Sequence, residues 1–199
     1  MLRRTICWIA CLSITAFSTD ELFRPGKASA YPNRQTQQGL MVAGAVYATE
    51  DQVKAPFGKV NPNHFGVLPV LLLLENSGRK SLDLRHMKVR MMSTGRQKVD
   101  PIPANEVRYR NSPNRPKMAK PTPPIPGLGK KKNPLDSPEI ESRAFAAPVL
   151  APGDSAHGFF YFLSEPGSAA SLYVTGIEET GTGKELFYID VPLASLGNQ

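Results

Sequence analysis

Three histidines are the side chains best suited to metal binding or acid–base chemistry in this chain of 199 residues, and they lie far apart: His64, His86 and His157. None belongs to an H-x-H or H-E-x-x-H motif, and no cysteine lies near any of them. His64 and His157 each sit among turn residues, so a fold that joined those two turns would create a metal site. Because histidines in turns are more often solvated, the sequence predicts neither a metal nor another cofactor.

A second group, Asp154, Ser155 and His157, contains the residue types of a hydrolase triad. Triad members normally come from separate elements that align them in space, whereas these three follow one another in a single turn. The chain also has no G-x-S-x-G nucleophile elbow. The sequence therefore favours a protein that is not an enzyme. A metal-dependent or hydrolytic enzyme that uses the loop histidines is the alternative.

The charge of the chain is concentrated in residues 111–138. The whole chain has 24 Lys and Arg against 17 Asp and Glu, a net charge of +7. This segment alone holds six basic residues, one acidic residue and eight of the 19 prolines. A stretch with so few large apolar groups cannot bury itself, so we expect a long, disordered, basic insertion loop.

Clustered cations attract anionic surfaces, and that attraction weakens as salt rises. We therefore expect the loop to contact a protein or an anionic envelope component. Nucleic acid is not expected, because the chain carries an export signal. The candidate contact residues are Lys117, Lys120, Lys130, Lys131 and Lys132.

The first 30 residues have the pattern of a secretory signal peptide. Arg3 and Arg4 precede an apolar run over residues 6–17, and Ala28-Ser29-Ala30 matches the small-residue cleavage pattern. The gap between the run and this triplet also allows an earlier cut. The run is shorter than the roughly 20 residues of a spanning helix, so no transmembrane span is expected in the mature chain. We expect a secreted or periplasmic protein. The alternative is an uncleaved N-terminal anchor.

After a flexible polar leader at residues 31–39, residues 40–199 read as one strand-rich domain. We expect strands near residues 40–48, 67–75, 87–92, 144–150, 158–163, 171–177 and 185–191, with further candidates at 96–99 and 106–110, and a short helical turn at 50–55 with Thr49 as its N-cap. The continuous apolar run at 67–75 indicates a strand buried on both faces. In the last strand, Phe187, Ile189 and Val191 are expected to face the core.

Many short strands, frequent turns and little helical periodicity are typical of an all-β protein. We predict an antiparallel, immunoglobulin-like β-sandwich of about seven to eight strands, interrupted by the Pro/Lys-rich insertion loop at 111–138. Neither half of the chain has enough strands for a closed two-sheet core, so we expect a single domain rather than two. With the signal and the strand pattern, this favours a binding or structural module of the bacterial envelope or extracellular space.

Several short motifs support this fold by resemblance. They are Phe57-Gly58-Lys59, Gly66-Val67-Leu68-Pro69-Val70 with Glu75-Asn76, Pro152-Gly153, Gly158-Phe159-Phe160-Tyr161-Phe162, Leu172-Tyr173-Val174-Thr175-Gly176 and Thr182-Gly183-Lys184-Glu185-Leu186. Together they resemble a group of uncharacterised exported bacterial proteins and are similar to extracellular immunoglobulin-like domains of unknown function. The resemblance covers most of residues 45–192. It implies a sandwich and export, and it carries no catalytic residue.

Overall fold

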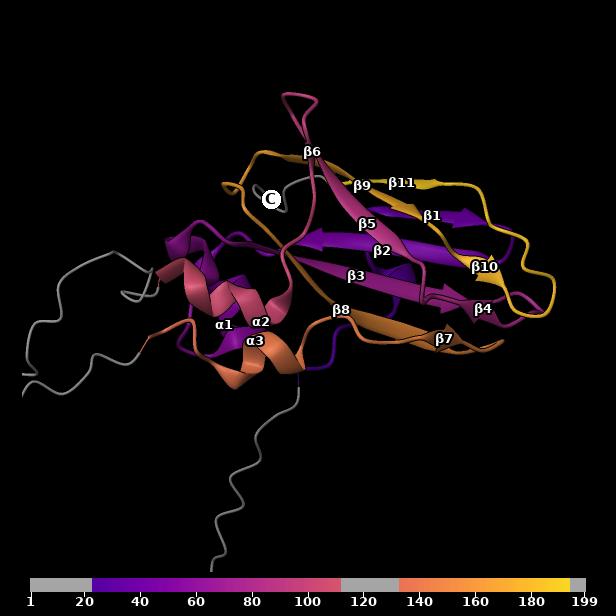
Figure 1. The fold of residues 1–199 in the computed structure, drawn as a ribbon, viewed down its shortest axis with the longest axis horizontal. Coiled ribbons are helices and arrows are strands. Elements are labelled where there is room, and N and C mark those ends of the chain that lie inside the picture. Colours follow the sequence, from indigo (N-terminus) through magenta and orange to yellow (C-terminus); the bar gives the residue numbers. More distant parts are fainter. Residues whose placement is uncertain (1–22, 112–132, 194–199) are drawn as a thin grey trace, which may run out of the picture.

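Two packed β-sheets and a layer of short helices make up the parts of the chain that this computed structural model describes, residues 23–111 and 133–193 (Figure 1). The strands there are β1 (Arg34–Gln37), β2 (Leu40–Val46), β3 (Leu68–Asn76), β4 (Leu82–Asp83), β5 (Lys88–Ser93), β6 (Lys98–Val99), β7 (Val149–Leu150), β8 (Ser155–Phe162), β9 (Ala169–Thr175), β10 (Glu178–Glu179) and β11 (Ile189–Pro192). The helices are α1 (Glu50–Phe57), α2 (Ala104–Val107) and α3 (Pro138–Ser142), with 3-10 turns η1 (Ala28–Ala30), η2 (Pro62–Phe65) and η3 (Arg108–Asn111).

All strand pairs within the sheets are antiparallel. One sheet has the order β1-β2-β3-β8, the second has the order β11-β9-β5-β6, and a small third sheet has the order β10-β4-β7. The fold is therefore the all-β sandwich that the sequence predicts. Seven of the strands in the described residues have at least four residues, and the other four have two.

The main core lies between the two larger sheets. Alternate residues of β3 point into this core, and residues of the second sheet cover them from across the sandwich. The β3 residues are Leu68, Val70, Leu72 and Leu74, and the covering residues of the second sheet include Val89, Met91, Leu172, Val174, Ile189 and Val191. All ten are at most 3% exposed. Because side chains alternate along a strand, the remaining residues of β3 point to the opposite face of its sheet.

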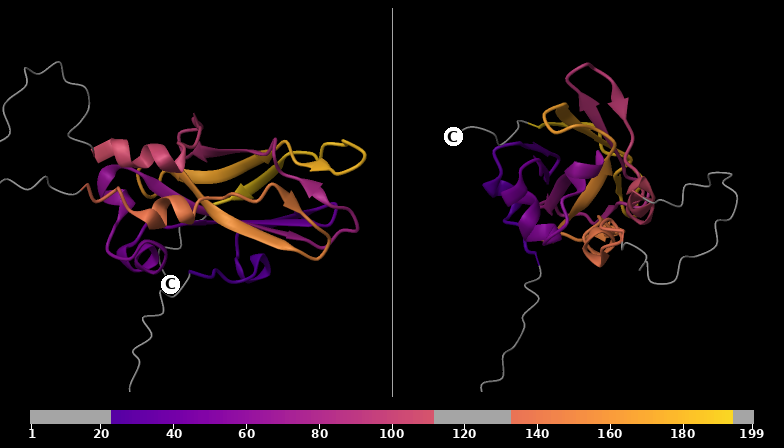
Figure 2. Two further views of the ribbon diagram at one scale, coloured as in Figure 1. Left: turned by 60° about the horizontal axis from the view of Figure 1, so that its bottom comes forward. Right: turned by 90° about the vertical axis from the view of Figure 1, so that its left-hand side faces the viewer.

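A second apolar cluster covers that opposite face, so β3 is buried on both sides as predicted. Leu71 and Leu73 of β3 and Phe159 and Tyr161 of β8 pack there against Val53 and Phe57 of α1, Val107 of α2, Leu135, Ile140 of α3 and Ala28 of η1. Figure 2 shows the helices and the N-terminal segment lying along this side of the sheet. The four aromatic residues of β8 fit the same arrangement, because Phe159 and Tyr161 face the helices while Phe162 faces the main core.

Helix α1 begins where the sequence places its N-cap. The Thr49 hydroxyl accepts a hydrogen bond from the Gln52 backbone N–H, and the Gln52 side chain accepts bonds from the N–H groups of Ala48 and Thr49. This reciprocal capping box satisfies N–H groups that have no partner within the helix. The helix runs to Phe57, two residues beyond the predicted turn, so that Phe57 reaches the second cluster.

The polar leader expected at residues 31–39 is wrong in its second half. Residues Arg34–Gln37 form β1, which pairs with β2 through a tight turn in which Gln38 and Gly39 have φ of 50° and 82°. Two successive residues with positive φ suit the right-handed twist of a two-residue hairpin. The sequence does not indicate this strand because β1 lies at a sheet edge, where three of its four side chains are exposed and need not be apolar.

Three further segments differ from the sequence-based expectation. Residues 106–110 form α2 and η3 instead of a strand, because only Val107 of this segment is buried. The strand expected at 144–150 shortens to β7. The last strand begins at Ile189, so Phe187 does not face the core and is 70% exposed, whereas Ile189 and Val191 are buried as predicted.

The backbone of Phe145 runs beside β8 so closely that Gly158 has no room for a side chain. A Cβ at Gly158 would lie 2.3 Å from Phe145 Cα and 2.5 Å from Phe145 N. The contact is fixed by two hydrogen bonds, from Phe145 N–H to Phe159 O and from Phe159 N–H to Arg143 O. We therefore expect Gly158→Ala to lower the free energy of unfolding by about 1–3 kcal/mol, measured by urea denaturation.

Gly95→Ala is the matched control for this substitution. Its nearest neighbour would be Ser93 Oγ at 3.7 Å, which is an ordinary contact. Equal stability of the Gly158→Ala variant and the wild type would show that the Phe145 backbone can shift away from β8 at little cost in free energy.

Candidate functional site

The three histidines do not converge. His64 lies in η2, directly before β3, and its Nε2 atom is 2.8 Å from Glu50 Oε1. His157 pairs with Leu73, five residues along β3 from Leu68, which corresponds to roughly 17 Å of strand. His86 Nδ1 lies 3.6 Å from Glu178 Oε1 of β10. Within the described residues, no group of three His, Cys, Asp or Glu side chains is placed to hold a metal ion.

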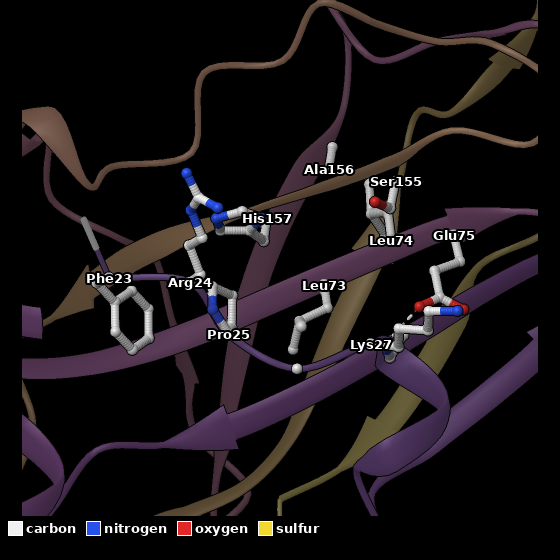
Figure 3. A pocket seen from close by; sticks show the side chains of 12 residues that line it. Phe23, Arg24, Pro25, Lys27, Leu73, Leu74, Glu75, Ser155, Ala156 and His157 are labelled. Atoms are coloured by element: carbon white, nitrogen blue, oxygen red, sulfur yellow. Dashed lines mark hydrogen bonds between the residues drawn. The ribbon is translucent and has the colours of Figure 1, made fainter. Parts of the chain in front are cut away.

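His157 instead lines a groove of about 390 Å³ between the sheet and the N-terminal segment. Residues 23–28 run over the outer face of β3 and β8, and Figure 3 shows Arg24 and Pro25 toward the His157 end, with Lys27 near Glu75 at the other. Partial burial lowers the pKa of His157 below its ordinary value of 6.5. The ring is therefore mostly neutral at pH 7.

The groove brings Glu75, Ser155 and His157 to one face of the sheet. Glu75 and Ser155 are cross-strand partners, and His157 follows on the same face of β8. No hydrogen bond connects Ser155 with His157 in the described part of the chain. Glu75 Oε1 accepts a hydrogen bond of 2.6 Å from the Ala28 N–H. Glu75 thus holds the chain segment above the groove.

We call residues 23–30 the strap. At its start, Phe23 packs edge-on against Tyr47, with ring centroids 6.1 Å apart, and lies 5.6 Å from the ring of Phe159. The guanidinium carbon of Arg143 lies 5.5 Å from the centre of the Phe23 ring. At its end, Ala28 is only 1% exposed. Both ends of the strap are therefore packed into the second cluster.

The insertion leaves from and returns to one place, which we call the stem: α2 and η3 on one side, residues 133–142 on the other. Arg108 spans it. Its Nη1 atom donates to Asp136 Oδ1 at 3.3 Å, its Nη2 atom pairs with Glu141, and its backbone O accepts from the Asn133 side chain. The insertion expected over 111–138 is therefore too long at its C-terminal end. Leu135 is buried at 2% exposed, Asn133 and Asp136 bond to Arg108, and α3 begins at Pro138.

Tyr161 fixes the stem to the sheet. Its hydroxyl donates a 2.7 Å hydrogen bond to the backbone O of Ile140 in α3, and Tyr161 is 1% exposed. Burial raises the pKa of Tyr161 well above its ordinary value, so the hydroxyl keeps the proton that it donates. The stem is thus tied to the same face of the sheet as the strap.

The five candidate lysines, Lys117, Lys120, Lys130, Lys131 and Lys132, lie outside the described residues. Their charge is not matched nearby in the sequence, since residues 112–132 hold six basic residues and no acidic one. Residues 23–111 and 133–193 hold 16 Lys and Arg against 15 Asp and Glu. The surplus positive charge of the chain therefore belongs to the segment that the stem carries.

Two groups of functional residues were missed from the sequence. The partners of Arg108 lie 28 and 33 residues further on, beyond the Pro-rich segment, and no motif connects them. In the sequence, Glu75 is the polar end of an apolar strand. Because it lies 47 residues from Ala28, the sequence does not indicate their contact. The small-residue triplet at 28–30 was noticed, but as a cleavage pattern rather than as a packing element.

Comparison with known proteins adds little to this geometry. No protein-family model and no curated protein matches the chain. Among solved structures, the fold is similar to that of MPT63, a secreted protein from Mycobacterium tuberculosis, with 10% identity over 82% of this chain and 93% of that one, and a TM-score of 0.36. In the described residues, no helix is both long and apolar enough to span a membrane.

The hydrogen bond from Tyr161 to Ile140 is open to a direct test. Tyr161→Phe keeps the ring but leaves the buried Ile140 carbonyl without its donor, so we expect a loss of about 1–3 kcal/mol in the free energy of unfolding. The urea midpoint should fall with an unchanged m-value. Tyr109→Phe is the control, because Tyr109 lies in the stem but is 64% exposed. Equal midpoints for the two variants would contradict the role assigned to Tyr161.

Proposed function

We propose that this protein is an exported, non-catalytic binding module that attaches to an anionic component of the cell envelope through residues 112–132. The folded body acts as the holder, and the basic segment makes the contact. The observation that carries this proposal is the partition of charge: a nearly neutral body and a separate segment with six positive charges.

The stem supports the proposal mechanically. The described residues that flank the basic segment are joined at Arg108, and α3 is bonded to the sheet through Tyr161. Six cations that start from one anchored place can approach the same anionic surface together, so their attractions add. Each cation near an anionic membrane surface contributes about 1 kcal/mol.

The scattered histidines favour a non-catalytic role over the alternative of a metal-dependent or hydrolytic enzyme. Each described histidine either pairs with a local carboxylate or lies in the groove under the strap. Export is supported by the N-terminal pattern of Arg3, Arg4 and the apolar run at 6–17. Export also places the basic segment where envelope lipids and polymers, rather than nucleic acids, are the available polyanions.

Vesicle co-sedimentation tests the proposal. The purified protein should bind vesicles that contain phosphatidylglycerol, bind phosphatidylcholine vesicles far less, and lose binding as salt is raised. Replacing Lys130, Lys131 and Lys132 together by Gln should weaken binding by on the order of tenfold or more. A soluble anionic glycan added as competitor should displace the protein.

The control removes the same charge from the folded body. Arg79, Lys88 and Lys98 are exposed and none forms an ion pair with another described residue, so their replacement by Gln changes net charge without touching a described contact. Equal weakening in both triple variants would mean that overall charge, and not residues 112–132, drives binding. Stoichiometric metal in the purified protein would instead favour the enzymatic alternative.

A further inference from the structure

We infer that signal cleavage occurs before Phe23, so that the strap at residues 23–30 stays in the mature protein as part of its fold. This inference rests on the proposed export of the chain. It assigns the processing site away from Ala28-Ser29-Ala30, although that triplet has the small-residue spacing of a cleavage site.

The first argument is what the strap covers. Leu73 and Phe159 are 3% and 2% exposed, and the strap residues lie over both of them. A chain that began at Tyr31 would lose the Phe23 ring, which packs against both Tyr47 and Phe159, together with the Arg143 contact to that ring. Apolar surface on the sheet would then face water, which is unfavourable in proportion to its area.

The second argument is the position of the triplet itself. Ala28, the first of its three residues, is 1% exposed, and its N–H group donates to the Glu75 carboxylate at 2.6 Å. Hydrogen bonds to a charged acceptor are stronger than neutral ones. The small side chain of Ala28 is explained by this packing, and the Tyr31 N–H bonds to Ala28 O in the η1 turn, whereas Ser29 and Ala30 are exposed. Ala28 therefore has a structural role that does not require cleavage.

The third argument is that an earlier sequence fits the cleavage rule better. Ala16-Phe17-Ser18 also has small residues at the first and third positions, and it stands at the end of the apolar run rather than more than ten residues beyond it. A cut after Ser18 leaves Asp20, Glu21 and the whole strap on the mature chain.

The mature N-terminus decides the question. The full-length chain is expressed in a bacterium that exports it, and the intact mass of the exported protein is measured. We expect a chain that starts at Thr19 and in any case retains Phe23. An exported chain that starts at Tyr31 would overturn the inference while leaving export intact. An exported chain that keeps Met1 would overturn the inference in favour of the uncleaved N-terminal anchor, and a chain that stays in the cytoplasm would overturn the proposed export.

Two matched substitutions locate the site independently. Ser18→Gln should block processing, so that the uncleaved precursor accumulates. Ala30→Gln should leave processing unchanged, with the mature mass altered only by the substitution itself; Ala30 is exposed, so the fold tolerates Gln there. The reverse result, with processing blocked only by Ala30→Gln, would place the cut after Ala30. In the exported protein, Phe23→Ala should lower the thermal midpoint, whereas a midpoint equal to that of wild type would show that the strap does not stabilise the fold.

Discussion

The double burial of strand β3 is the constraint from which the rest of the structure follows. Its nine residues are apolar on both faces apart from the two at its end, so both faces must be kept from water. A two-sheet sandwich covers only one face of each sheet. The second sheet therefore meets half of the requirement, and other parts of the chain must meet the rest. Full burial of each large apolar side chain is worth about 1.5–3 kcal/mol, which makes an uncovered face costly.

Three segments from distant parts of the sequence share the task of covering the outer face. Helix α1 follows β2, the stem comes from either side of the basic segment, and the strap comes from before the first strand. Each contributes between one and three buried side chains to the second cluster, and none is long enough to fold by itself. Helix α3 has only five residues, so its stability comes from Ile140, Tyr161 and the ion pairs of Arg108 rather than from helix propensity. The outer layer is consequently a product of the sheet beneath it.

How much of this was readable from the sequence depends on how local each signal is. The apolar run of β3, the aromatic run of β8 and the Thr49 cap are each contained within a few residues. These local patterns predict the β-sandwich and the start of α1. Strand β1 was missed because an edge strand needs no apolar side chains. Leu135 and Ile140 are isolated apolar residues among prolines, so nothing marks them as buried until α3 meets Tyr161. Contacts such as Glu75 with Ala28 depend on pairings 47 residues apart.

The stem has a consequence for how this protein can change over evolutionary time. Arg108 holds the two sides of the stem together through Asp136 and Glu141. The stability of the fold therefore depends on the distance between the two sides of the stem and depends little on the length of chain that connects them. Doubling the length of a flexible loop costs only about 0.6 kcal/mol in closure entropy. The stem therefore acts as a socket in which one connecting sequence can be exchanged for another. Relatives with the same body could carry segments of quite different length, charge and partner, and an engineer could graft a foreign peptide at the same place.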